Sequence, residues 1–185
     1  MQSENAKSMD AVTVNVMANK TMQEASGATG VYTVECIGQD GQVKWSETFK
    51  NLVTTVGKND MLDKYFAGSS YTAAWYMGLV DGSTSPTYAA ADTLASHSGW
   101  TELAAGTAYS GNRPAVSWGS ASAGSKASTA TSFSITAANT VAGALMCTAA
   151  SGTSGVLYSA GSFTGGNRIV ASGDTLNVTY TATLT

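Results

Sequence analysis

The only histidine of the chain, His97, lies in a short segment rich in groups suited to acid/base chemistry. Residues 92–102 read DTLASHSGWTE and hold two carboxylates, Asp92 and Glu102, beside several hydroxyls. A hydrolase could use such a histidine to move a proton to and from a nucleophilic hydroxyl. A catalytic triad has no fixed spacing in sequence, however, and no nucleophile-elbow motif surrounds a serine here. We therefore interpret His97 and Asp92 as groups that hydrogen-bond to the backbone and hold an ordered loop, and we expect no enzymatic activity.

Metal and phosphate chemistry have still fewer candidate residues. One histidine and two distant cysteines, Cys36 and Cys147, do not make a ligand set, and no Asp-rich loop has the spacing of a calcium site. The glycine-rich residues 161–166 lack the lysine and the strand-loop-helix context of a phosphate cradle. Because both cysteines lie in apolar runs, we predict buried free thiols. The sequence thus predicts no metal and no other cofactor.

The four tryptophans, Trp45, Trp75, Trp100 and Trp118, offer a different kind of function. Together with eight tyrosines they could form a platform on which sugar rings stack. Each also lies in or beside a strand pattern, where large aromatic side chains usually fill the core between two sheets. We assign Trp75 to the core. Trp100 and Trp118 flank loops, and we name them as candidate interface residues.

Charged side chains are distributed very unevenly along the chain. After Glu102 only Arg113, Lys126, Arg168 and Asp174 are charged, and the other 17 charges lie in the first 102 residues. The second half must therefore face water through Ser, Thr, Asn, Gly and backbone groups. With a net charge of −3 and nine scattered basic residues, the chain lacks the basic patch that holds nucleic-acid phosphates. Binding or assembly is favoured over acid/base catalysis, and nucleic acid is not an expected partner.

No stretch of the sequence reaches the roughly 18 apolar residues of a membrane span. The polar start MQSENAKSMD also lacks the basic and apolar regions of a signal peptide. We therefore expect no membrane partner and a protein made in a cytoplasm. Such a protein can still leave the cell as part of an assembled particle.

The elements that must position these residues are mostly short strands. Alternation of apolar and polar residues is clearest near the C-terminus, where Leu176, Val178 and Tyr180 alternate with threonines and Asn177. Around residues 52–66, Met61, Leu62, Tyr65 and Phe66 fall on one side of a predicted helix whose charged residues stay in water. Further strands are predicted at residues 31–37, 42–49, 71–80, 100–103, 115–118, 131–137, 141–148, 155–159 and 168–171.

Seven to nine short strands joined by Gly/Ser/Thr turns predict a mainly β protein, an antiparallel β-sandwich of jelly-roll kind with one short helix. Two long connections interrupt the strands. Residues 83–99 are expected to form a surface loop with a short helical turn near residues 92–96, and residues 119–132 a long loop within the sandwich. The sandwich domain is assigned to residues 29–185.

An extended N-terminal arm, residues 1–28, precedes this domain. Val12, Val14 and Val16 alternate with polar residues and with Met17, which is a strand pattern without a partner strand. Two outcomes remain open: an unstructured terminus, or a strand that adds to the sheet edge of a neighbouring subunit. For the second outcome, these three valines are interface candidates.

Several sequence runs resemble a known family. These runs are NLVTTVGKNDMLDKYFAG, AWYMGLVDG, AAADTLASHSGWTE, AYSGNRP and SGDTLNVTYT. They are similar to small virion proteins of tailed bacteriophages and prophages, labelled tail-fibre-like, head-decoration or cement proteins. The resemblance covers most of residues 30–185 and does not cover the arm.

The resemblance implies a β-rich protein that oligomerises and binds the outer surface of a virus particle, on either the head or the tail. It carries over no catalytic residue. Our first hypothesis is a capsid decoration or cement protein, a dimer or trimer that binds the major capsid protein on the outer surface of the virion. A cement protein would staple adjacent capsid subunits and gain avidity from many copies. The alternative within the family is a tail-associated receptor- or glycan-binding module, which would expose Trp100 or Trp118 in a groove.

Overall fold

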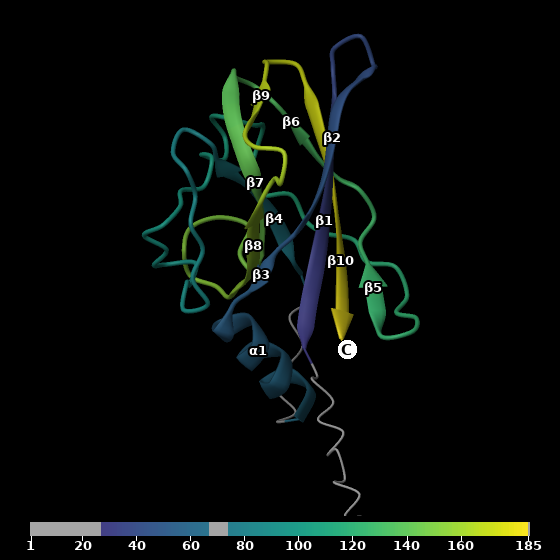
Figure 1. Ribbon diagram of the computed structural model, residues 1–185, viewed down its shortest axis with the longest axis vertical. Coiled ribbons are helices and arrows are strands. Elements are labelled where there is room, and N and C mark those ends of the chain that lie inside the picture. The colour runs from purple at the N-terminus through teal and green to yellow at the C-terminus, as the bar shows by residue number, and fades with distance from the viewer. Residues whose placement is uncertain (1–26, 67–73, 185) are drawn as a thin grey trace, which may run out of the picture.

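Two antiparallel sheets pack face to face, as the computed structural model of the chain shows for residues 27–66 and 74–184 (Figure 1). The first sheet holds β2 (Val43–Lys50), β1 (Ala28–Ile37) and β10 (Thr175–Leu184) in that order, with β5 (Ser125–Ala127) and β6 (Thr131–Ser134) both paired to β10. The second holds β3 (Leu52–Val53), β8 (Leu157–Ser162), β7 (Asn139–Cys147) and β4 (Tyr76–Asp81), with β9 (Arg168–Val170) also paired to β7. One helix, α1 (Thr55–Phe66), projects at one end of the sandwich. The prediction of a mainly β protein with antiparallel sheets and one helix is confirmed.

The centre of the first sheet is the pair formed by β1 and β10. Their register runs without a break from Ala28 opposite Leu184 to Ile37 opposite Thr175. Leu176, Val178 and Tyr180 are fully buried, whereas Asn177 and Thr179 between them are half-buried on the outer face. The period-two pattern therefore predicted both the strand and the face that it buries.

The second sheet is buried on both faces. Its inner face joins the main core, and its outer face contributes Leu145 and Leu157 to a second, smaller cluster. Leu94 and Trp100, from the connection between β4 and β5, close this cluster from outside. Residues 83–99 contain no helix or strand and are mostly exposed, which confirms the expected surface loop, and Leu94 anchors this loop on the sheet.

Within this loop, the predicted helical turn near residues 92–96 is wrong. Thr93 and Ser96 exchange backbone hydrogen bonds of 2.9 and 3.2 Å, which makes a tight turn instead. That turn points Leu94 inward, where its side chain is 1 % exposed. The gain from burying a leucine, about 2 kcal/mol, explains why this connection lies flat on the sheet.

Helix α1 packs on the sandwich through a short, closely approaching face. Thr54 caps it, because its hydroxyl accepts a hydrogen bond of 3.1 Å from the Gly57 amide. A Cβ atom on Gly57 would lie 2.7 Å from the Tyr158 carbonyl oxygen in β8, so only glycine allows this approach. Met61 follows one turn later and accepts a hydrogen bond from the Tyr158 hydroxyl at its sulfur, 3.3 Å away.

The side of α1 that was predicted to be covered lies in solvent. Leu62 is 55 % exposed, Tyr65 74 % and Phe66 77 %. The helix turns Gly57 and Met61 toward the sandwich, so the apolar stripe that includes Leu62 faces away. The prediction that Met61 shares one covered side with these three residues is therefore wrong, and we call Leu62, Tyr65 and Phe66 the α1 outer face.

Short strands account for the remaining differences from the sequence predictions. Strands β3 and β5 were not predicted, and residues 119–132 contain β5 where a continuous loop was expected. The predicted strands at residues 100–103 and 115–118 are reduced to isolated bridges, such as Val80 with Glu102 and Tyr76 with Ala115. The predicted arm lies outside the described residues, except that Gly27 precedes β1 and Ala28 begins it. No helix in residues 27–66 and 74–184 is long and apolar enough to span a bilayer.

Candidate functional site

The segment that holds His97 is organised around the indole of Trp100. The Asp92 carboxylate accepts hydrogen bonds of 3.0 Å from the Trp100 ring N–H and from the Ala89 amide. The His97 ring stacks on Trp100, with centroids 3.9 Å apart and planes at 20°. Its Nδ1–H donates to the Thr93 carbonyl oxygen, 3.0 Å away. The interpretation that His97 and Asp92 hold an ordered loop through the backbone is confirmed.

These contacts differ from those of a catalytic triad. The His97 Nδ1 atom is bonded to the backbone carbonyl of Thr93. The Asp92 carboxylate binds Trp100 and a backbone amide rather than His97. A triad needs the acid to orient the histidine and the histidine to contact a nucleophile. The geometry of this segment instead serves to fix Trp100 over the second sheet.

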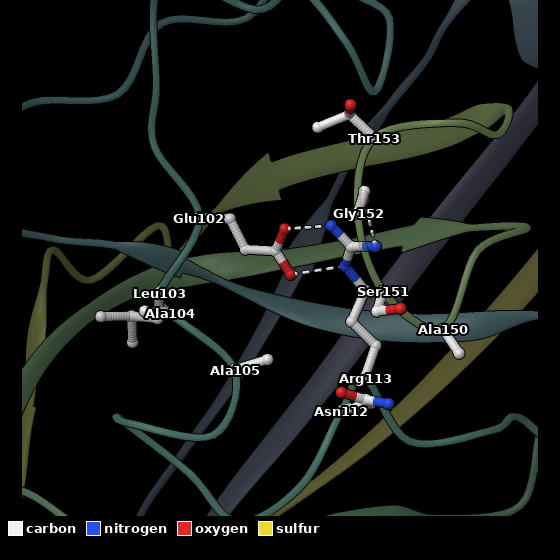
Figure 2. Close-up of a pocket in the computed structure, with 10 residues that line it drawn as sticks. All are labelled: Glu102, Leu103, Ala104, Ala105, Asn112, Arg113, Ala150, Ser151, Gly152 and Thr153. Atoms are coloured by element: carbon white, nitrogen blue, oxygen red, sulfur yellow. Dashed lines mark hydrogen bonds and ion pairs between the residues drawn. The ribbon is translucent and has the colours of Figure 1, made fainter.

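A surface pocket of about 320 Å³ lies where this segment ends, beside the ion pair of Glu102 and Arg113 (Figure 2). The guanidinium contacts both carboxylate oxygens, at 2.7 and 2.6 Å. It also donates to the carbonyl oxygens of Ala149 and Gly152 at 2.9 and 3.0 Å. Because the bonded carboxylate stabilises the cation, the pKa of Arg113 is raised above its ordinary value. The pair thus fastens the loop after β7 to the segment after β4.

The pocket is lined mainly by short side chains, and its two charged residues, Glu102 and Arg113, are paired with each other. Around the ion pair it is lined by backbone and by short side chains, among them Ala104, Asn112 and Ser151. Glu102 engages Arg113 through both oxygens, so both are already used within the molecule. The lining therefore offers a ligand backbone groups and short polar side chains as hydrogen-bonding partners.

Each of the four charged residues after Glu102 has a partner inside the molecule. Arg113 binds Glu102, Arg168 binds Glu47, and Asp174 binds Lys44 at 2.7 Å. The Lys126 ammonium donates to the Gly119 carbonyl oxygen, 2.8 Å away. The three ion pairs each join a residue of the first 102 to one of the last 83. The sparse charges therefore hold the fold together, and the surface from residue 103 to 184 is coated by hydroxyls, amides and glycine.

The α1 outer face is the largest departure from this polar surface. Its two aromatic rings touch edge to face, with centroids 5.0 Å apart. Within the described residues, the other large apolar side chains with high exposure are Val43, Ile169 and Leu184. Isolated exposed apolar side chains are ordinary, whereas three on one helix face indicate a contact surface. The sequence contained this signal, because the spacing of the three residues identified the stripe.

The sequence-predicted interface residues lie in different surroundings. Trp100 is only 4 % exposed, so its indole offers almost no surface to a partner. Trp118 is half-buried, and its ring makes a T-shaped contact with the Tyr180 ring, with centroids 6.3 Å apart. Trp75 packs against the main core, as predicted. Val12, Val14 and Val16 lie outside the described residues.

The cysteines behave as predicted. Both are free and buried, and burial raises the pKa of the Cys36 thiol to about 11. Cys36 contacts the Asp174 carboxylate at 3.7 Å, within the same cluster as Lys44. Among residues 27–66 and 74–184, no group of three or more His, Cys, Asp or Glu side chains is placed to hold a metal ion.

Comparison with known proteins adds no relative: no protein-family model matches the chain, and no curated protein matches it significantly. The surface chemistry and the sequence resemblance are therefore the observations that bear on function.

Proposed function

We propose that the chain is a non-enzymatic structural protein of a bacteriophage virion. It decorates and cements the outer surface of the capsid by binding major capsid protein subunits and copies of itself. It needs no cofactor and no nucleic acid, and it is made in the host cytoplasm before joining the particle. The resemblance of most of residues 30–185 to small virion proteins supports this proposal.

The observation that carries the proposal is the surface of residues 103–184, where few side chains are charged and each charged one has a partner within the molecule. Interface cores are depleted of charged residues, because each buried charge must give up its water. Here Arg113, Arg168 and Asp174 are already held in ion pairs within the molecule, and Lys126 binds a backbone carbonyl. Hydroxyls and backbone groups can be covered by a neighbour at lower cost. A lattice of identical contacts then adds avidity to weak individual contacts.

The jelly-roll description of the sandwich belongs to this proposal. The chain alternates between the sheets, crossing between them from β2 to β3, β4 to β5, β6 to β7 and β9 to β10. Such crossings, with the first and last strands paired at the centre of one sheet, are the kind of connection found in jelly rolls.

The N-terminal arm is proposed to reach a neighbouring subunit by strand addition through Val12, Val14 and Val16. Deleting residues 2–26 leaves β1 intact, since that strand begins at Ala28. We expect the deletion to weaken particle binding and to lower the temperature at which decorated particles lose their DNA. Unchanged binding and unchanged particle stability would remove the arm from the proposal.

The alternative, a tail-associated receptor- or glycan-binding module, has less support. It expects an exposed tryptophan in a groove, whereas Trp100 is buried and Trp118 is half-buried against Tyr180. Neither is among the residues that line the pocket at Glu102 and Arg113.

A cryo-EM reconstruction of intact particles, with antibody labelling of this protein, tests the two locations directly. We expect its density to repeat over the icosahedral shell, in contact with capsid subunits. Density confined to the tail or its fibres would overturn the capsid proposal in favour of the alternative.

A further inference from the structure

Helix α1 has the reverse of the usual amphipathic orientation. The residues that approach the sandwich, Gly57 and Met61, are flanked by Asp60 and Lys64, which are half-buried. Leu62, Tyr65 and Phe66 point outward together with the exposed Lys58 and Asn59. A surface helix normally turns its apolar stripe to the core. Here the stripe is left for a partner outside the described residues of one chain.

The outward side of α1 has an internal order. At 3.6 residues per turn, residues seven apart lie almost in line along a helix. Lys58 and Tyr65 therefore form one row, and Asn59 and Phe66 a second, with Leu62 between them. In both rows the polar residue is toward the N-terminal end and the aromatic residue toward the C-terminal end. This makes the surface complementary to a reversed copy of itself.

We propose that the α1 outer face is the contact between two copies of this chain, joined as an antiparallel helix pair about a twofold axis at Leu62. A twofold contact uses the same patch on both subunits. The axis brings Leu62 against its own symmetry mate. Each row then lies opposite its own reversed copy, so Lys58 faces Tyr65 of the second copy and Asn59 faces Phe66 of the second copy.

The charged residues of α1 favour a second, antiparallel copy of the chain as the partner of this face. A lysine ammonium over a tyrosine ring is attracted by the negative face of the ring, and the twofold axis forms this contact twice. A parallel pair would instead place Lys58 against Asn59 and Tyr65 against Phe66 of the second copy, which leaves the rings without a cation. The helix carries Lys58, Asp60, Asp63 and Lys64, which balance, so two copies meet without net repulsion along α1.

The inference specifies where the self-association in the proposed function occurs, and it rests on that proposal for its biological role only. One helix face covers less than the roughly 800 Å² per partner of a stable interface. The dimer is therefore weak in solution and gains strength where the particle holds many copies close together. Its first test uses the free protein without particles.

Sedimentation velocity over roughly a hundredfold range of protein concentration measures this dimer. We expect the wild-type chain to pass from monomer to dimer, and Leu62→Asp to remain monomeric because two carboxylates would meet at the axis. Lys58→Gln should weaken the dimer roughly fivefold to thirtyfold, through loss of two cation–π contacts. Ile169→Asp is the matched control: Ile169 is 75 % exposed on β9, away from α1, and its change should leave the dimer intact.

Disulfide trapping tests the orientation. The native cysteines are fully buried, so introduced cysteines react alone. A mixture of Lys58→Cys and Tyr65→Cys chains should give mainly the mixed dimer under a mild oxidant. Predominant Tyr65→Cys homodimers would contradict the antiparallel pair.

Circular dichroism should show that every variant keeps its β fold, because each changed side chain is exposed. A monomeric wild-type chain at all concentrations, or equal dimerisation of Leu62→Asp and Ile169→Asp, would overturn the inference. Adding Leu62→Asp to particles separates this outcome from the proposed function. If that variant still decorates capsids, the capsid proposal stands even where the dimer contact fails.

Discussion

At the scale of single residues, the ion pair of Arg113 and Glu102 is expected to hold the connection between β4 and β5 against the loop after β7. Arg113→Met would leave the Glu102 carboxylate without its cation and the Ala149 and Gly152 carbonyls without their donor. Loss of one partner of a buried pair costs about 3 kcal/mol in the free energy of unfolding. Urea denaturation measures the change.

The matched controls for this prediction are one single and one double variant. Lys126→Met removes an exposed cation that binds only a carbonyl, and it should change the free energy of unfolding by less than about 0.5 kcal/mol. Glu102→Leu combined with Arg113→Met removes both charges and should recover part of the loss. Equal stability of Arg113→Met and Lys126→Met would show that the pair is not structural.

The Asp174 carboxylate predicts a dependence of stability on pH. Burial opposes its ionisation, but the Ala171 amide at 2.9 Å and the Lys44 ammonium at 2.7 Å lower the pKa of Asp174 below its usual value. A carboxylate whose pKa is lower in the folded state stabilises the fold above the unfolded-state pKa, near 4. This contribution is lost as the pH falls through the folded-state pKa.

Asp174→Asn checks the sign of that effect. The difference in free energy of unfolding between the native chain and the variant should be largest at neutral pH. It should shrink progressively below about pH 4. A difference that is constant from pH 7 to about pH 2 would rule out the ionised carboxylate as its source.

How much of the site the sequence predicts depends on whether its contacts are local. Thr93, His97 and Trp100 lie within eight residues of Asp92, and the role of His97 and Asp92 in an ordered loop was predicted. Trp100, in contrast, was named as an interface candidate, and its contacts with Asp92 and His97 were not predicted. Arg113 reaches Ala149 and Gly152 from a distant part of the chain, and no local pattern indicates which carbonyls it binds.

At the scale of elements, the approach of α1 to β8 depends on one missing side chain. Gly57→Ala would place a Cβ atom 2.7 Å from the Tyr158 carbonyl oxygen and 2.9 Å from its Cα, both backbone atoms. Alanine gains about 1 kcal/mol in helix propensity. Displacement of the helix should cost about 1–3 kcal/mol, so that the fold is destabilised or α1 detaches.

Asn59→Ala is the control, because it makes a similar change on the exposed side of the same helix. It should be neutral or slightly stabilising. Thermal unfolding followed by circular dichroism compares the two variants. A more stable Gly57→Ala chain would mean that α1 does not pack closely on β8.

Elements also differ in how well their pattern predicts their contacts. Strand β10 was predicted with its buried face, because alternation with a period of two leaves one choice once the core is known. Helix α1 was predicted in position but not in orientation. The spacing of Leu62, Tyr65 and Phe66 identifies an apolar stripe, and the step from stripe to core assumes that the partner belongs to the same chain.

At the scale of the whole molecule, the sparsely charged surface of residues 103–184 predicts particle binding with little dependence on salt. Between about 0.1 and 1 M salt the screening length falls from about 10 to 3 Å, which weakens contacts between exposed charges. We expect the dissociation constant for particles, measured by co-sedimentation, to change by less than about threefold over this range. A steep loss of binding with salt would show that the contact is formed by charged groups instead.

Because β1 pairs with β10, the first sheet can form only after β10 has been synthesised. The first described strand has no neighbour on one side until the chain has been synthesised past Leu184. A growing chain can form the hairpin of β1 and β2 but cannot complete the first sheet before β10 is made, and β10 follows all the other described strands. A chain that lacks β10 is therefore expected not to form the first sheet, and so not to present the surface that the proposed capsid contact requires.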